Sequence, residues 1–162
     1  MNSGKSAPGL ETVERAVCGA LTLQEASLVV YRSSVLVEFK TTLLQPGLVV
    51  TRERGRRTWQ IGAFEGHHCH LNLALVTEVW FDAEPVSCQA GRLNYTVWFL
   101  SANDCGNPYR PKGMFSVTLN GPYREDGSPR LELIGAVYAL YDSESHAAGI
   151  SASEAFLAAR PG

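Results

Sequence analysis

Short alternating segments fill the middle of this 162-residue chain, and they limit its fold more than any other feature. Apolar, often β-branched residues alternate there with polar ones, which is the period of strands buried on one face. Turn formers such as Pro46-Gly47 and Asn120-Gly121-Pro122 separate the segments, and Arg32-Ser33 predicts a tight hairpin. The predicted strands cover residues 27–31, 34–39, 48–50, 58–62, 68–75, 76–82, 92–100 and 114–119. Such a run predicts a large antiparallel sheet, curled or doubled.

Helical spacing occurs at the two ends of the chain. Apolar residues recur over positions 10–20 with the period of an amphipathic helix. A second helix is predicted over Pro129–Tyr141 with Ser128 as its N-cap, although Leu133 to Leu140 also fits a buried strand. A capping box at residues 151–154 predicts a short last helix. Together with the strands, these segments predict an α+β fold with an N-terminal helix and C-terminal helices.

Composition and length are those of one ordinary globular domain, with 45% hydrophobic and 19% charged residues. We predict a disordered lead over residues 1–9, a single α+β ligand-binding domain over 10–145, and a tail with a short helix over 146–162. The polar start of the chain lacks the apolar core of a secretory signal, and no stretch approaches the roughly 18 apolar residues of a membrane helix. A formal net charge of −2 argues against a nucleic-acid partner. We therefore expect a cytoplasmic protein with neither nucleic acid nor membrane as partner.

Three of the four histidines lie within four residues, at the start of one predicted strand. Successive side chains of a strand point to opposite faces, so His68, His70 and Asn72 are predicted to share one face and Cys69 to face the core. Two imidazoles at this spacing stand about 6.6 Å apart at Cα, close enough to converge on one metal ion, and one of them could ligate a haem iron. The pair thus predicts a site without identifying its occupant.

The histidine pair also allows other interpretations. A metal-dependent enzyme could use His68 and His70 to hold zinc or another divalent metal. It would need a third ligand and an acid/base carboxylate, for which Glu65 and Glu78 are the nearest options. The sequence has no nucleophile elbow, P-loop or dinucleotide fingerprint, so no catalytic residue is predicted. Alternatively, the histidines are simply polar residues near a solvated sheet edge.

One basic cluster stands out in a chain of slightly acidic balance. Arg52, Arg54, Arg56 and Arg57 lie within Thr-Arg-Glu-Arg-Gly-Arg-Arg. A solvated turn is the simpler interpretation of this stretch. An anion clamp is the functional one, because guanidinium groups match carboxylates bidentately.

The order of the predicted elements resembles that of a known family. An N-terminal helix, the paired strands 27–31 and 34–39 ending in Val-Glu-Phe, and the histidine strand running from His70 to Asp82 are followed by a long aromatic strand and a C-terminal helix. This order is similar to that of the cytosolic haem-utilisation carriers of the HutX/ChuX type, single-domain relatives of the HemS proteins. The similarity spans roughly residues 27–145. It implies a split-barrel-like antiparallel fold, a homodimer, and haem or another tetrapyrrole as ligand.

The resemblance places His70 at the family's strand histidine. Cys69 stands where the family has a glycine, and Asn72 where many members have a second histidine. A haem site needs an axial donor, an apolar slot and positive charge for the propionates. The residues expected to supply these are His70 and His68 as donors, Trp98 and Met114 in the slot, and Arg56 and Arg92 at the propionates. The expected function is iron utilisation as a haem carrier; a metal-dependent enzyme, or a structural or regulatory module of the same fold that has lost its ligand, remains the alternative.

Overall fold

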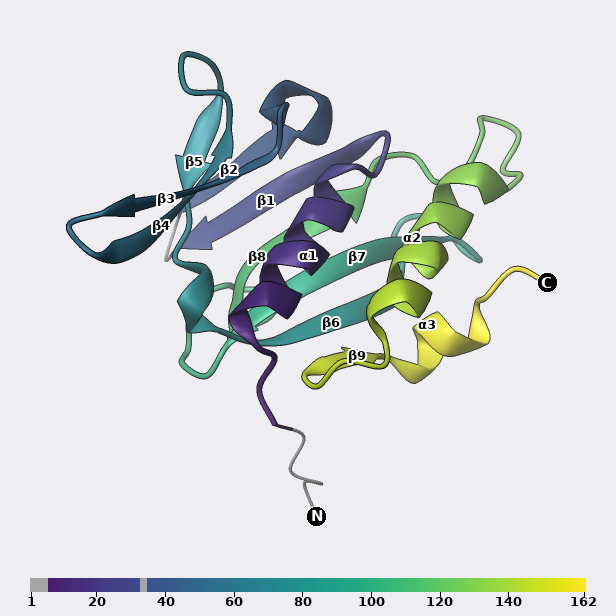
Figure 1. Ribbon diagram of the computed structural model, residues 1–162. Helices are drawn as coiled ribbons and strands as arrows, with labels where there is room; N and C mark the ends of the chain where they lie inside the picture. Colours follow the sequence, from purple (N-terminus) through teal and green to yellow (C-terminus); the bar gives the residue numbers. More distant parts are fainter. Residues whose placement is uncertain (1–5, 33–34) are drawn as a thin grey trace.

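The structure is a computed structural model that describes residues 6–32 and 35–162. Two sheets and the helices that pack on them form the body (Figure 1). The elements in chain order are α1 (Leu10–Leu21), β1 (Ala26–Arg32), β2 (Val35–Lys40), the 3-10 turn η1 (Thr41–Leu44), β3 (Leu48–Glu53), β4 (Arg56–Gly62), β5 (His68–His70), the 3-10 turn η2 (Leu73–Leu75), β6 (Val76–Pro85), β7 (Leu93–Ser101), β8 (Gly113–Leu119), α2 (Leu131–Glu144), β9 (Ile150–Ala152) and α3 (Glu154–Ala158). The predicted α+β class is confirmed.

The larger sheet has six strands in the order β2-β1-β8-β7-β6-β9. All its pairs are antiparallel except β6 with β9, where Val79 pairs with Ile150 in parallel. The smaller sheet has three antiparallel strands in the order β3-β4-β5. The predicted large antiparallel sheet is therefore present together with a second sheet, and a short parallel strand is added at one edge.

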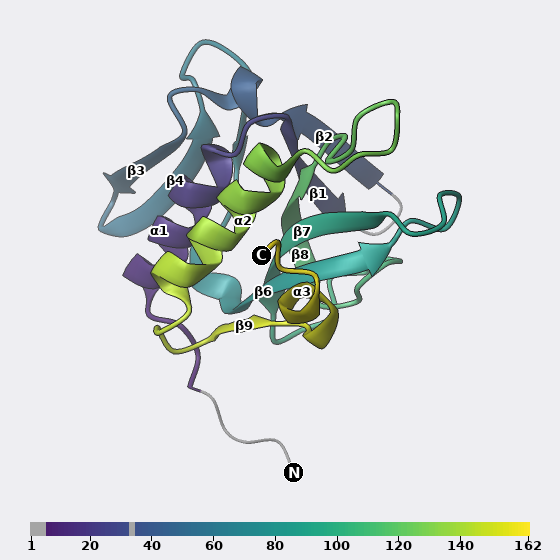
Figure 2. The same cartoon turned by 90° about the vertical axis from the view of Figure 1, so that its right-hand side faces the viewer.

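One face of the larger sheet carries the core. Phe99 and Phe115 stack there with ring centroids 4.4 Å apart, and both are fully buried. Helices α1 and α2 lie side by side over this face (Figures 1 and 2), and Val17 and Val137 extend the same core. The alternation read from the sequence thus marks the face that the helices cover. No helix among the described residues is long and apolar enough to cross a membrane.

The chain ends differ in detail from the prediction. Helix α2 begins at Leu131 after Arg130, so Ser128 does not cap it, and the helical alternative for residues 133–140 is the one that forms. The last helix is capped by Ser153, whose Oγ accepts a hydrogen bond from the Phe156 amide at 3.0 Å. Strand β9 was not predicted. The predicted disordered lead falls partly, and the hairpin at Arg32-Ser33 partly, on residues outside those described.

The histidine strand is shorter than predicted. Strand β5 ends at His70, and the chain then turns into η2, where the Asn72 side chain accepts a hydrogen bond from the Ala74 amide. Leu73 is fully buried as expected, but Leu75 is exposed because it no longer belongs to a strand. His68, His70 and Asn72 were predicted to share one face of a strand. Only His68 and His70 do so, because Asn72 lies beyond the end of β5.

Gly62 is required where β4 turns toward β5. Its φ is +109°, and a Cβ there would stand 2.1 Å from the carbonyl oxygen of His67. Gly47 has a similar φ of +102°, but a Cβ there would meet no atom within 4 Å. Gly47→Ala therefore measures the cost of the backbone conformation alone and serves as the control. We expect Gly62→Ala to destabilise the protein by at least about 2 kcal/mol more than Gly47→Ala in urea unfolding, because a backbone atom cannot move aside cheaply. Equal losses for the two variants would contradict the close approach.

Candidate functional site

His70 sits at the end of β5, where the smaller sheet faces the larger one. Its Cα pairs with that of Gln60 on β4, so strand pairing sets its position. The rings of His68 and His70 lie at right angles with centroids 5.4 Å apart, and both side chains are exposed. The prediction that the two imidazoles share one face is confirmed.

A cavity of about 620 Å³ opens next to His70. One wall is formed by His70 and the residues that follow it, and the other by β1, β8 and the loop after β7. Met114 on β8 lines this cavity, so the structure brings together the predicted donor and a predicted slot residue. The volume lies within the range of about 300–1,000 Å³ typical of small-molecule sites.

A second cavity of about 370 Å³ adjoins the first and shares His70 with it. Arg56 and Trp59 on β4 line it, together with the segment from His70 to Asn72. Arg56, expected to meet an anionic group, thus lines a cavity together with His70. His70 therefore lines two cavities, one of them shared with Met114 and the other with Arg56.

Trp98 does not line the His70 cavity. It is buried, with its ring stacked on Tyr31 at 5.9 Å and the Arg110 guanidinium 5.3 Å from its centroid. It lines a separate cavity of about 300 Å³ on the sheet face opposite the helices. Tyr31 lines both that cavity and the His70 cavity, so its ring lies between Trp98 and the His70 cavity.

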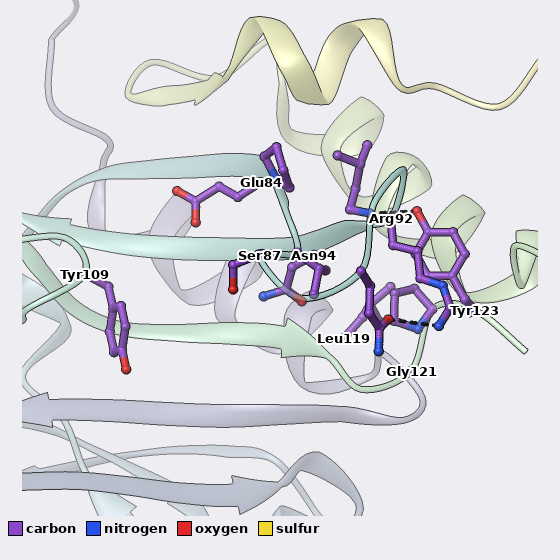
Figure 3. Close-up of a pocket in the computed structure, with 13 residues that line it drawn as sticks. Glu84, Ser87, Arg92, Asn94, Tyr109, Leu119, Gly121 and Tyr123 are labelled. Carbon is purple, nitrogen blue, oxygen red and sulfur yellow. Dashed lines mark hydrogen bonds between the residues drawn. The ribbon is translucent and has the colours of Figure 1, made fainter. Parts of the chain in front are cut away.

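Arg92 lines a further cavity, of about 630 Å³, beyond the ends of β6 and β8 (Figure 3). Its Nη1 donates a hydrogen bond to the side-chain oxygen Oε1 of Gln89 at 2.9 Å. Its guanidinium lies 5.5 Å from the centre of the Tyr123 ring. Glu84 and Tyr109 lie at the other end of this hollow in Figure 3. The structure does not bring Arg92 into a cavity with His70.

Sequence reasoning missed three contributors to the His70 cavity. They are Tyr31 and Arg32 at the end of β1 and the loop segment Asn103–Gly106. Arg32 was assigned to a hairpin, and the loop only to turn formers. The sequence signal for a binding residue here is an arginine next to an aromatic residue at the end of a strand. It becomes informative only when the elements that lie near that strand in space are known.

The described residues contain no group of three or more His, Cys, Asp or Glu side chains placed to hold a metal ion. Cys69 lies between the two histidines in sequence, and burial raises the pKa of its thiol to about 11. It is therefore a neutral thiol near pH 7. Glu78, considered as an acid/base group, instead accepts a hydrogen bond from Ser151 on β9. Within residues 6–32 and 35–162, therefore, the histidine pair is not part of a three-ligand group of the kind that a catalytic zinc site uses.

Comparison with known proteins gives a likeness of fold. No protein-family model matches the chain, and no curated protein matches its sequence. A crystal structure of ChuX is 13% identical with a TM-score of 0.59, over 86% of this chain and 75% of that one. A protein from Erwinia carotovora is 16% identical with a TM-score of 0.58, over 85% and 74% of the two chains. A second structure, described as the heme binding protein ChuX, is 16% identical with a TM-score of 0.56, over 88% and 78%. The chain has the ChuX fold, as the resemblance implied.

Proposed function

We propose that this protein is a cytoplasmic haem-binding carrier in which His70 supplies the axial ligand. The observation that carries the proposal is that His70 and Met114 line one cavity of about 620 Å³ between the two sheets. A fold shared with a protein described as heme binding supports it. Iron in a bound haem accepts an imidazole nitrogen as an axial ligand, and His70 is exposed enough to offer one.

The cavity offers apolar and basic side chains that a tetrapyrrole would use, beside polar ones such as Asn103 and Asp104. Val30, Leu71 and Met114 offer apolar side chains, of which the Met114 thioether could also face the iron. Arg32 on one side of His70 and Arg56 on the other offer guanidinium groups for propionates. The His68 ring lies 5.4 Å from that of His70, so His68 is the alternative axial ligand. Trp98 and Arg92 have no role in the proposal, because they line separate cavities.

Titration with hemin and with iron-free protoporphyrin IX tests this function. We expect a saturable Soret band with hemin at one equivalent per chain, and weaker binding of the iron-free porphyrin, since only hemin can be ligated by His70. Equal affinity for both would mean that the porphyrin ring binds through apolar contacts alone, and it would overturn the role of His70 as iron ligand. No saturable binding of either would overturn the carrier function and favour a structural or regulatory module.

We also propose a homodimer that forms through strand β2. This edge strand exposes Val35, Leu36 and Val37 in succession, with 59%, 52% and 40% of their surface accessible. An apolar edge of this kind is a ready site for strand pairing, and a second copy meets it about a two-fold axis. Antiparallel pairing centred on Val37 would set Val35 of each copy against Phe39 of the other, so the apolar run would be paired within strand β2 itself.

Light scattering during gel filtration measures the mass that distinguishes the two states. We expect the unsubstituted chain to elute at twice the mass of one chain, and Leu36→Glu to elute as a monomer, because a carboxylate in a paired apolar edge is left without water. Leu157→Glu on α3 is the matched control, since Leu157 is equally exposed at 50% but lies on another element. A monomeric unsubstituted chain, or a dimeric Leu36→Glu variant, would contradict the β2 interface.

A further inference from the structure

The two walls of the His70 cavity belong to different sheets. His70 and Leu71 continue the smaller sheet, whereas Arg32 and Met114 belong to the larger one. The distance between the walls is therefore set by how the smaller sheet sits on the rest of the molecule. A contact that fixes the smaller sheet controls the width of the cavity.

Glu14 makes such a contact from the middle of α1. Its Oε1 accepts a hydrogen bond from Trp59 Nε1, and its Oε2 accepts one from Arg57 Nη2, both at 2.6 Å. Only 14% of the Glu14 side chain is accessible to solvent, so both bonds are sheltered. Hydrogen bonds to an ionised carboxylate are about twice as strong as neutral ones. One carboxylate thus joins α1 to two alternate residues on the face of strand β4 that is turned toward this helix.

Helix α1 is itself held to the larger body. Val13 and Val17 are buried in the common core, and Arg15 forms an ion pair with Glu144 of α2 at 3.2 Å. Glu14 lies on this anchored helix, so its carboxylate has a fixed position. The smaller sheet is positioned relative to that point.

The contact is close to the histidine. Arg57 and Trp59 line the smaller cavity next to His70, and the Leu71 amide donates a hydrogen bond to the Trp59 carbonyl at 3.3 Å. A shift of Trp59 would therefore be passed to the residue directly after His70. Trp59 therefore connects the two places: its indole N–H donates a hydrogen bond to Glu14, and its carbonyl oxygen accepts one from Leu71, the residue after His70.

We infer that Glu14 is a positioning residue for the His70 cavity. It sets the smaller sheet at the spacing that aims His70 at a ligand held against Met114. It also forms an ion pair with Arg57, which stands directly across from Arg52, and so leaves Arg56 as the other guanidinium at the smaller cavity. This inference rests on the proposed haem-binding function, but its effect on the smaller sheet does not require a ligand.

The test compares Glu14→Ala, Glu14→Gln and Trp59→Phe with the unsubstituted chain. Alanine removes both bonds, glutamine keeps an acceptor for Trp59 only, and phenylalanine keeps an aromatic ring without the indole N–H. Glu11→Ala is the control, because Glu11 is an exposed acid in the first turn of the same helix. Amide hydrogen exchange is read over Gln60–Leu71 without ligand, and the spectrum of histidine-ligated hemin is read with it.

We expect Glu14→Ala to speed exchange of the β4–β5 amides about tenfold and to weaken hemin binding by a similar factor, with a smaller share of histidine-ligated hemin. Glu14→Gln and Trp59→Phe should show the same change to a lesser degree, and Glu11→Ala none. Unchanged exchange in Glu14→Ala, or changed exchange with an unchanged hemin spectrum, would overturn the inference. Hemin binding that is absent from the unsubstituted chain would overturn the proposed function instead, while the exchange result would still report on Glu14. If Glu14→Ala does not fold, Trp59→Phe decides the question with the same readouts.

Discussion

Replacing His70 by alanine is expected to remove the Soret band of histidine-ligated hemin and to weaken hemin binding by about a hundredfold or more. An axial ligand bonds directly to the iron, and even the outer partners of metal ligands contribute roughly 10–100-fold to affinity. His70 is exposed at the end of a strand, so its removal leaves the core untouched. Absorbance titration gives the affinity and the ligation state together, and circular dichroism confirms that the variant is folded.

Two other histidines serve as controls for that result. His146 follows α2 and is exposed, outside the lining of the His70 cavity, so His146→Ala should bind hemin as the unsubstituted chain does. His68→Ala should keep the histidine-ligated spectrum, because His68 does not line the cavity that Met114 lines. A full band in His70→Ala would remove the proposed ligand. Loss of the band in His68→Ala alone would transfer the role to His68.

Replacing Phe81 by alanine is expected to destabilise the protein by about 3–5 kcal/mol, the usual cost of emptying a buried phenylalanine site. Phe81 on β6 is fully buried, and its ring lies 5.2 Å from that of Tyr141 and 5.8 Å from that of Phe156. These neighbours come from α2 and α3, which pack rigidly, so the site cannot collapse easily. Urea unfolding followed by fluorescence measures the loss.

The matched control for Phe81 is a phenylalanine on the surface. Phe64 is 70% exposed in the turn between β4 and β5, so Phe64→Ala should change stability by no more than about 0.5 kcal/mol. A loss below about 1 kcal/mol for Phe81→Ala would mean that α3 does not pack on β6 in solution. The experiment therefore also reports on how firmly the last residues of the chain are held.

The larger sheet could be predicted because several of its strands carry apolar residues at every second position. In β7, the apolar residues Tyr95, Val97 and Phe99 occupy every second position and all face the helices. A pattern of this kind needs no knowledge of the partner strand, since burial on one face alone produces it. Helix α1 was predictable for the same reason with a different period.

Strand β9 and the end of β5 could not be predicted in this way. Three residues are too few to show a period, and Ile150 becomes a strand only because Val79 of the distant β6 pairs with it. At the other place, the apolar residues Leu73 and Leu75 continue an apparent alternation after the strand has ended. There a local 3-10 turn, with the Asn72 side chain at its start, overrides the pattern.

The candidate site was predictable only in part. Strand alternation was enough to place His68 beside His70. It cannot say which cavity a residue lines, because that depends on contacts between the two sheets. Met114 and Arg56 lie at the His70 cavities, whereas Trp98 and Arg92 line others. Arg32 was missed because its spatial neighbours come from β5 and β8.

The brevity of β5 has a consequence for how a carrier would give up its cargo. Only Gln60, Ile61 and Gly62 of β4 pair with this strand, so the proposed iron ligand lies on one of the two shortest ladders of the described residues, each of three pairs. Fraying of so few pairs costs far less than unfolding the body, and segments of this kind open long before the core does. If the protein carries haem, delivery of the haem to an acceptor would then need no global rearrangement. Local opening of β5 would move the imidazole away while the six-stranded sheet and its helices stay intact.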